Sequence, residues 1–321
     1  MKTTASLAWL AALFGSLACA RVPRTTALDP AVPAVRLGDY TFHAETFGSP
    51  EKPPLIVIHG GPGGDYAYLL SLKGLADEYH VLFYDQRGSG LSPREEHPDP
   101  SIEAFVRDLD GWVDRHGGGR QVRLVGHSWG AMIATAYLAR HGEKVSHAVI
   151  AEPGILHPES ARAMMTALKE SQTLWRKLAV VPLIVRYPFV VSEDGHERMD
   201  YIATKMMGSS GGPPYQCEGE KLPPGTFVRA GYRVMNATVI PLLDDPGRFQ
   251  DDYTRGLEAY GGKTLFLSGR CSFIGYDFQE RYHRPRFPPG TLHQVIEGTG
   301  HNMFTLKPAE SLEAVRPFLR G

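Results

Sequence analysis

A short serine motif flanked by glycines constrains the fold of this chain more than any other stretch. Residues 123–125 favour a β-strand, Gly-His-Ser-Trp-Gly follows at 126–130, and an alanine-rich helical pattern runs from Ala131 to Arg140. A strand, a forced turn and a helix place Ser128 at a strained backbone position, which is tolerated when the residues two positions away on either side are glycine. The pattern predicts an exposed nucleophilic serine at the start of a helix, where free backbone N–H groups favour developing negative charge.

A second glycine-rich segment follows another expected strand. The apolar residues 55–58 lead into His-Gly-Gly-Pro-Gly-Gly at 59–64. Glycine density alone marks only a flexible loop, but beside the serine turn it lets a backbone N–H face a substrate oxygen. The two segments together predict an oxyanion hole formed by the N–H groups of Gly61 and Trp129. A phosphate-binding loop is not indicated, because the Lys-Ser/Thr ending is missing.

Strands and helices are expected to alternate through this part of the chain. The buried strand expected at 81–84 ends in Asp-Gln-Arg-Gly-Ser-Gly-Leu-Ser at 85–92, and Ser101 is expected to cap a helix that stops before the glycines at 117–119. This alternation is typical of a parallel sheet, whose ligands gather at the carboxyl ends of the strands. The three motifs described so far each follow such a strand.

In the order and approximate spacing of these three motifs, the chain resembles the α/β hydrolases and, more narrowly, the proline iminopeptidase family. The resemblance covers residues 35–154 and resumes near residue 263. It implies an α/β-hydrolase fold, with a mostly parallel central sheet flanked by helices and an inserted, mainly helical cap. The predicted segments are a signal peptide at 1–20, the hydrolase core at 21–154 and 257–321, and the cap at 155–256.

His301 is the candidate catalytic base. It stands between Gly300 and Asn302, after an expected strand that ends at Ile296. A histidine after the last strand is where this fold supplies its base, and the order of Ser128 before His301 agrees with that arrangement.

Two carboxylates are candidates for the acid that would orient His301. In the resembled family an aspartate stands three residues after the glycine that closes the preceding strand, and this sequence has Ser272 there; the nearest acid is Asp277. Some α/β hydrolases, including a subset of the haloalkane dehalogenases, instead carry the acid after the strand that follows the nucleophile helix. Glu152 matches that location. We rank Glu152 first and Asp277 second, with a triad lacking a proper acid as the remaining alternative.

The expected cap would roof the serine, exclude water and select the substrate. Proline iminopeptidases place cap carboxylates to hold the free amino terminus of a peptide, often beside a Trp-x-x-Trp-Glu string that this sequence lacks. Glu218 and Glu220 are the candidate replacements, although acidic residues in loops are more often simply solvated.

The predicted chemistry is acyl transfer to water through an acyl-enzyme on Ser128. The first hypothesis is an exported aminopeptidase like the proline iminopeptidases, acting on short peptides. The second is an esterase or amidase that acts on small acyl substrates, and the third is an inactive binding protein that keeps the fold. A serine rather than an aspartate at the turn argues against dehalogenase or epoxide-hydrolase chemistry. No cofactor and no metal are expected, since the histidines and cysteines lack a zinc spacing.

The first twenty residues are typical of an export signal. A charged start and an apolar run over residues 5–18 precede Ala-Cys-Ala at 18–20. Cleavage after Ala20 is favoured, with lipidation at Cys19 as the alternative, so a periplasmic or extracellular location is expected. No other segment is long and apolar enough to cross a membrane.

Charge and cysteine content limit the remaining possibilities. The net charge is −1, which argues against a nucleic-acid partner and leaves a small molecule or short peptide as the expected ligand. After removal of the signal, Cys217 and Cys271 remain. They form either a disulfide or two free thiols, because the sequence does not show whether their Cα atoms approach.

Overall fold

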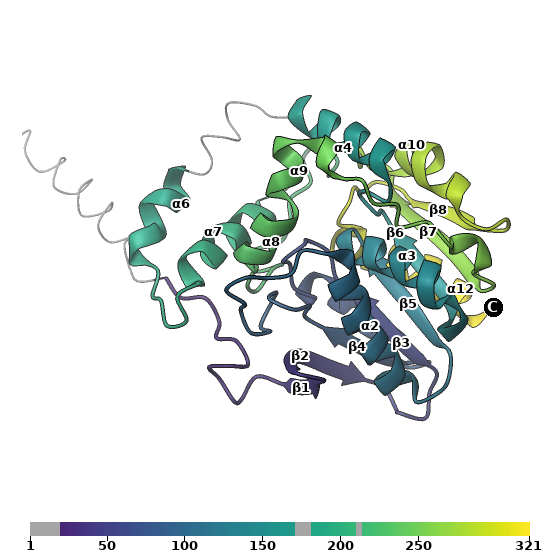
Figure 1. The fold of residues 1–321 in the computed structure, drawn as a ribbon, viewed down its shortest axis with the longest axis horizontal. Helices are drawn as coiled ribbons and strands as arrows, with labels where there is room; N and C mark the ends of the chain where they lie inside the picture. Colours follow the sequence, from purple (N-terminus) through teal and green to yellow (C-terminus); the bar gives the residue numbers. More distant parts are fainter. Residues whose placement is uncertain (1–19, 171–180, 210–213) are drawn as a thin grey trace, which may run out of the picture.

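One sheet organises the structure, a computed structural model that describes residues 20–170, 181–209 and 214–321 (Figure 1). The proposed signal peptide and Cys19 therefore lie outside the described residues, apart from Ala20. The strands are β1 (Ala34–Leu37), β2 (Tyr40–Phe47), β3 (Pro54–Ile58), β4 (His80–Tyr84), β5 (Val122–His127), β6 (Val145–Ala151), β7 (Lys263–Gly269) and β8 (Leu292–Ile296). Their order across the sheet is β1-β2-β4-β3-β5-β6-β7-β8. The pairs β1–β2 and β2–β4 are antiparallel and the other pairs are parallel.

Helices cover both faces of the sheet, which explains the continuous apolar run of β3. Ile56 and Ile58 belong to one core with α2 (Ile102–Gly117) and α3 (Trp129–His141), whereas Leu55 and Val57 belong to the opposite core. The opposite core also contains residues of η1 (Ala67–Leu75), α11 (Met303–Leu306) and α12 (Pro308–Arg320). A strand covered on both faces is apolar at every position rather than at alternate ones. The predicted fold class is confirmed.

Between β6 and β7 the chain leaves the sheet and forms helices, a segment that we call the cap. The helices of the cap are α4 (Pro158–Glu170), α6 (Val181–Arg186), η3 (Tyr187–Phe189), α7 (Glu197–Gly208), α8 (Tyr232–Thr238), α9 (Ile240–Asp244) and η4 (Pro246–Arg248). The remaining short helices are η2 (Gly142–Lys144), η5 (Leu257–Ala259), α10 (Tyr276–Phe278), η6 (Gln279–His283) and η7 (Arg284–Arg286). In Figure 1 the helices α6 to α9 lie to one side of the sheet. No helix in the described ranges has the length and apolar character of a membrane span.

A buried ionic network joins the cap to the core. Asp200 of α7 accepts hydrogen bonds at 2.8 Å from Nε of Arg94, in the loop after β4, and from Nε of Arg229. All three side chains are at most 3% exposed. Arg229 also donates to the carboxylate of Asp194, and Asp65 accepts from the N–H of Arg229. The two arginines face the carboxylates of Asp194 and Asp200, and burial raises the pKa of the third carboxyl, that of Asp65, to about 7. These ion pairs hold α7 against the core.

Candidate active site

The serine turn has the strained geometry that its glycines require. Ser128 lies between β5 and α3 with φ 57° and ψ −119°, and its N–H donates to the carbonyl of Ala151 at 2.8 Å. A Cβ on Gly130 would lie 2.1 Å from the carbonyl oxygen of Ile58, and one on Gly126 would lie 2.6 Å from the Gly130 oxygen. Only glycine fits at both positions, because backbone occupies the space of a side chain.

His301 and Glu152 meet at the carboxyl edge of the sheet, after the two strands that flank β7. The Oε2 atom of Glu152, which follows β6, lies 2.6 Å from Nδ1 of His301, which follows β8. Oε1 of the same carboxylate accepts from the N–H of Gly269 at 2.7 Å, and the Glu152 side chain is fully buried. Each oxygen thus has its own donor. Ser128 and Glu152 are also the two described non-glycine residues with positive φ, and such strain gathers at functional sites.

The second candidate acid lies elsewhere. Asp277 is exposed on the short helix α10. Ser272, at the position of the family aspartate, is buried, and its hydroxyl has no hydrogen-bond partner among the described residues. The strands β6 and β7 are paired neighbours, so the loops after both strands approach the same imidazole. Of the two candidate acids, the structure brings Glu152 to His301.

The two predicted oxyanion donors are both close to Ser128. Gly61 has φ 139° and borders the same pocket as Ser128, and Trp129 is the first residue of α3. Within the described part of the chain, the backbone N–H groups of Gly61 and Trp129 donate to no other protein group. The Trp129 side chain packs away from the pocket, edge-on against Phe105. Two free N–H groups beside a serine are what an oxyanion hole needs.

A pocket of about 170 Å³ opens onto Ser128 and His301. Its lining is aromatic, apolar or neutral polar: Gly60, Gly61, Tyr68, His127, Ser128, Met207, Tyr215, Phe227, His301 and Asn302. No aspartate, glutamate, lysine or arginine is among these described lining residues. The pocket therefore suits a small acyl group without charge.

A hydrogen-bond chain that the sequence did not predict connects the parts of the site. The N–H of Gly60 donates to the hydroxyl of Tyr68 at 2.7 Å, and that hydroxyl lies 2.7 Å from Nδ1 of His127. Nε2 of His127 lies 2.8 Å from the carbonyl oxygen of His301. Burial holds the pKa of His127 well below its usual value, so the ring is neutral. Its Nε2–H then donates to His301, and its Nδ1 accepts from Tyr68.

Comparison with known proteins agrees with this architecture. A family profile described as alpha/beta hydrolase fold matches residues 53–190. The chain is an α/β hydrolase by fold. The predicted relationship to this fold and to the proline iminopeptidases is confirmed.

The proteins that resemble this α/β hydrolase include both peptidases and an esterase. A proline iminopeptidase of Heyndrickxia coagulans is 27% identical over 283 residues, 84% of this chain and 91% of that protein. One from Lactobacillus helveticus is 31% identical over 146 residues, and this match spans only 44% of either protein. A thermophilic esterase from Thermogutta terrifontis has a TM-score of 0.62 at 19% identity, covering 90% of this chain and 97% of the esterase. At that identity the likeness shows the fold alone.

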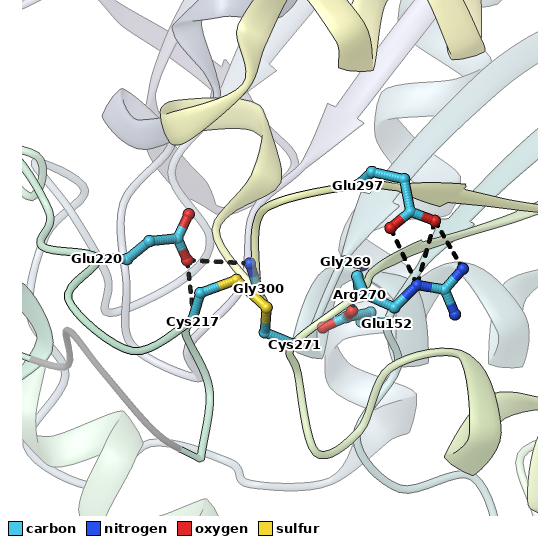
Figure 2. Close-up of a disulfide and its surroundings, with 8 residues drawn as sticks. All are labelled: Glu152, Cys217, Glu220, Gly269, Arg270, Cys271, Glu297 and Gly300. Carbon is cyan, nitrogen blue, oxygen red and sulfur yellow. Dashed lines mark hydrogen bonds and ion pairs between the residues drawn. A yellow bond between two sulfur atoms is a disulfide. The ribbon is translucent and has the colours of Figure 1, made fainter.

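The structure does not place the candidate cap carboxylates in the pocket of this hydrolase. Glu218 is exposed. Glu220 is half-buried, and its Oε2 accepts from the backbone N–H groups of Cys217 and Gly300. Of the two alternatives for Cys217 and Cys271, a disulfide or two free thiols, the structure has the disulfide, with a Cα–Cα distance of 5.0 Å (Figure 2).

The pocket walls include residues that the sequence analysis did not single out. Tyr68 comes from η1, Met207 from α7, and Tyr215 and Phe227 from loops of the cap. None belongs to a short motif. Asn302 alone had a local signal, because it follows His301 directly.

Proposed function

We propose that this chain is a serine hydrolase that transfers the acyl group of a small ester or amide to water. The observation that carries the proposal is the convergence of Ser128, His301 and Gly61 on one pocket, with Glu152 bound to His301. Trp129, the second oxyanion donor, directly follows Ser128 at the start of α3. The imidazole Nε2 takes the proton of the Ser128 hydroxyl as its oxygen attacks the carbonyl carbon. Nδ1–H donates to Glu152 throughout, which fixes the tautomer and stabilises the charged ring.

The backbone N–H groups of Gly61 and Trp129 bind the oxyanion of the tetrahedral intermediate. His301 then gives its proton to the leaving alcohol or amine, and an acyl-enzyme on Ser128 remains. A water molecule, deprotonated by the same imidazole, attacks this ester and releases the acid. No charge has to be supplied by the pocket walls for either half of the reaction.

Two substrate classes compete for this site. The proline iminopeptidase relatives favour an aminopeptidase that removes an N-terminal proline, and the match to one of them covers 84% of the chain. The uncharged lining favours an esterase or amidase, because a free ammonium group in a small pocket needs a carboxylate partner. We favour the second class. The Cys217–Cys271 disulfide supports the proposed export in either case, because disulfides persist in oxidising compartments.

The test compares aryl esters of acetate and butyrate with a prolyl arylamide and its N-acetylated form. We expect the highest kcat/KM on an ester, and no gain when the amine of the arylamide is free. A preference for the free prolyl arylamide would assign the aminopeptidase instead. A fluorophosphonate should label Ser128, as mapped by peptide mass, and should leave the Ser128→Ala variant unlabelled. An unlabelled wild type that hydrolyses none of the substrates would leave only the inactive binding protein.

The hydrogen-bond chain through Tyr68 gives a further prediction. Tyr68→Phe removes the acceptor of the Gly60 N–H and the donor to His127, and leaves both buried without a partner. We expect kcat/KM to fall about tenfold, because Gly60 precedes an oxyanion donor and small displacements there are costly. The free energy of unfolding should fall by about 1–3 kcal/mol.

The control for this prediction is Tyr260→Phe. The hydroxyl of buried Tyr260 donates to the carbonyl of Lys263, at the opposite end of β7 from the site. This variant should lose some stability in urea unfolding and keep its kcat/KM. An equal loss of activity in both variants would show that Tyr68 acts through stability alone.

A further inference from the structure

One segment of the cap lies directly against the loop that carries His301. This segment, residues 214–220, is called the strap here. Cys217 of the strap is bonded to Cys271, which lies two residues beyond the end of β7 (Figure 2). The carbonyl oxygen of Tyr215 accepts a hydrogen bond of 2.7 Å from the backbone N–H of His301. The strap therefore contacts the backbone of the candidate base itself.

Glu220 closes the strap and ties it to the residue before His301. Its Oε2 accepts from the N–H of Cys217 at 2.9 Å and from the N–H of Gly300 at 3.1 Å (Figure 2). The carboxylate thus links a turn of the strap to the base loop with two charge-assisted hydrogen bonds, which are stronger than neutral ones. The mechanism described above does not use this carboxylate.

Gly300 shows how closely the strap packs. A Cβ at this position would lie 2.2 Å from the carbonyl oxygen of Tyr215 and 2.5 Å from the Cα of Gln216. The backbone of the strap packs directly against the backbone of Gly300, with no flexible side chain between them. A displacement of the strap would therefore also displace the loop that carries His301.

The far end of the disulfide reaches the same loop and the acid. The N–H of Cys271 donates to the carbonyl of Thr299 at 3.1 Å, and Gly269 donates to Glu152. The N–H of Phe273 donates to the carbonyl of Pro214 at the start of the strap. The disulfide therefore closes a ring of contacts that includes the strap, the loop after β7 and the loop after β8.

We propose that the disulfide-bonded strap fixes the position of the His301 imidazole, with Glu220 as a positioning residue that acts through Gly300. The expected effect on kcat rests on the proposed function, whereas the expected effect on the position of the His301 imidazole does not. Tyr215 adds a second effect, since its ring lies 5.3 Å from the His301 ring and borders the pocket. The strap thus joins the placement of the base to the shape of the acyl pocket.

The kinetic test uses Glu220→Ala, Glu220→Gln and the double replacement Cys217→Ala with Cys271→Ala. We expect Glu220→Ala to lower kcat for an aryl ester about tenfold, with KM within about twofold, since a displaced base slows chemistry more than binding. The rate constant of fluorophosphonate labelling should fall by the same factor. Glu220→Gln keeps one acceptor oxygen and should retain most of the activity. The cysteine double variant should resemble Glu220→Ala, and combining the two changes should cost little more.

The matched control is Glu218→Ala, an exposed carboxylate in the same segment, which should change nothing. Equal kcat in Glu220→Ala and Glu218→Ala would overturn the proposal. So would a loss of kcat that disappears when the assay is run well below the melting temperature of each variant.

A spectroscopic readout separates this inference from the proposed function. In protein labelled with ¹³C at the histidine Cε1 atoms, the His301 resonance is assigned by its loss in His301→Gln. We expect Glu220→Ala and the cysteine double variant to shift or broaden that resonance and to leave that of His147, at the other end of the sheet, unchanged. If the wild type hydrolyses no substrate but the His301 resonance still shifts in the variants, the proposed function is wrong and the proposed role of the strap in positioning His301 is supported. If the His301 resonance does not change in these variants, the proposed role of the strap is wrong, whatever their hydrolase activity.

Discussion

Replacing Glu152 by glutamine is expected to lower kcat/KM for an aryl ester by about 10³–10⁴-fold. The carboxylate accepts from both Nδ1 of His301 and the N–H of Gly269, one oxygen to each. Glutamine keeps one oxygen and turns the other into an NH₂ donor. If the oxygen stays on Gly269, the NH₂ group faces Nδ1 and favours the tautomer whose Nε2 carries the proton. That imidazole cannot take the proton of Ser128, so the loss falls mainly on kcat.

Asp277→Asn is the control for this experiment, and it should change kcat/KM by less than about twofold. Asp277 is exposed on α10, so its replacement leaves no buried group without a partner. Steady-state kinetics on both variants decides between the two acids. A large loss in Asp277→Asn together with a mild effect of Glu152→Gln would move the acid to Asp277. Circular dichroism should show that Glu152→Gln, a change in a fully buried residue, is still folded.

The parts of the site that the sequence predicted are those with local causes. The strand, turn and helix around Ser128 require glycine at 126 and 130, and the close approach of Ile58 to Gly130 shows why. The apolar runs of the central strands predict a sheet covered on both faces. The acid was harder to assign, because Glu152 and Asp277 both follow strands that are neighbours in the sheet. The sequence around each carboxylate is enough to rank the two as candidates. Which one reaches the imidazole depends on the path of the chain after each strand.

The parts that the sequence did not predict depend on contacts between distant segments. Cys217 and Cys271 are 54 residues apart, and their pairing depends on how the cap folds back onto the loop after β7. The sequence makes Glu220 a candidate ligand for a substrate amine, but its carboxylate accepts a hydrogen bond from the backbone N–H of Gly300 instead. A glutamate in a loop has no periodic pattern that distinguishes these two roles. Tyr68 carries no motif either, and its role appears only when η1 lies beside β5.

Replacing Asp200 by alanine is expected to lower the free energy of unfolding by about 3–5 kcal/mol, the largest stability loss that we predict. The carboxylate accepts from Arg94 and Arg229, and it also accepts at 3.0 Å from the N–H of Tyr232 at the start of α8. Removing it leaves two buried guanidinium groups that face each other with one fewer negative charge. Arginine does not lose its proton to relieve this, so the protein bears the desolvation cost or opens to water. Urea unfolding, followed by circular dichroism, measures the change.

Glu96→Ala tests whether burial, rather than a missing ion pair, causes this loss. Glu96 also joins the core to the cap, through Arg233 at 2.7 Å and His196 at 3.2 Å, but its side chain is 67% exposed. Water replaces those contacts, so we expect a change of at most about 1 kcal/mol. Equal effects of the two replacements would mean that the buried network does not hold the cap. If Asp200→Ala is the more costly, its KM should also rise, because α7 carries Met207 into the wall of the acyl pocket. The same buried charges would then set both the stability of the cap and the shape of the site beneath it.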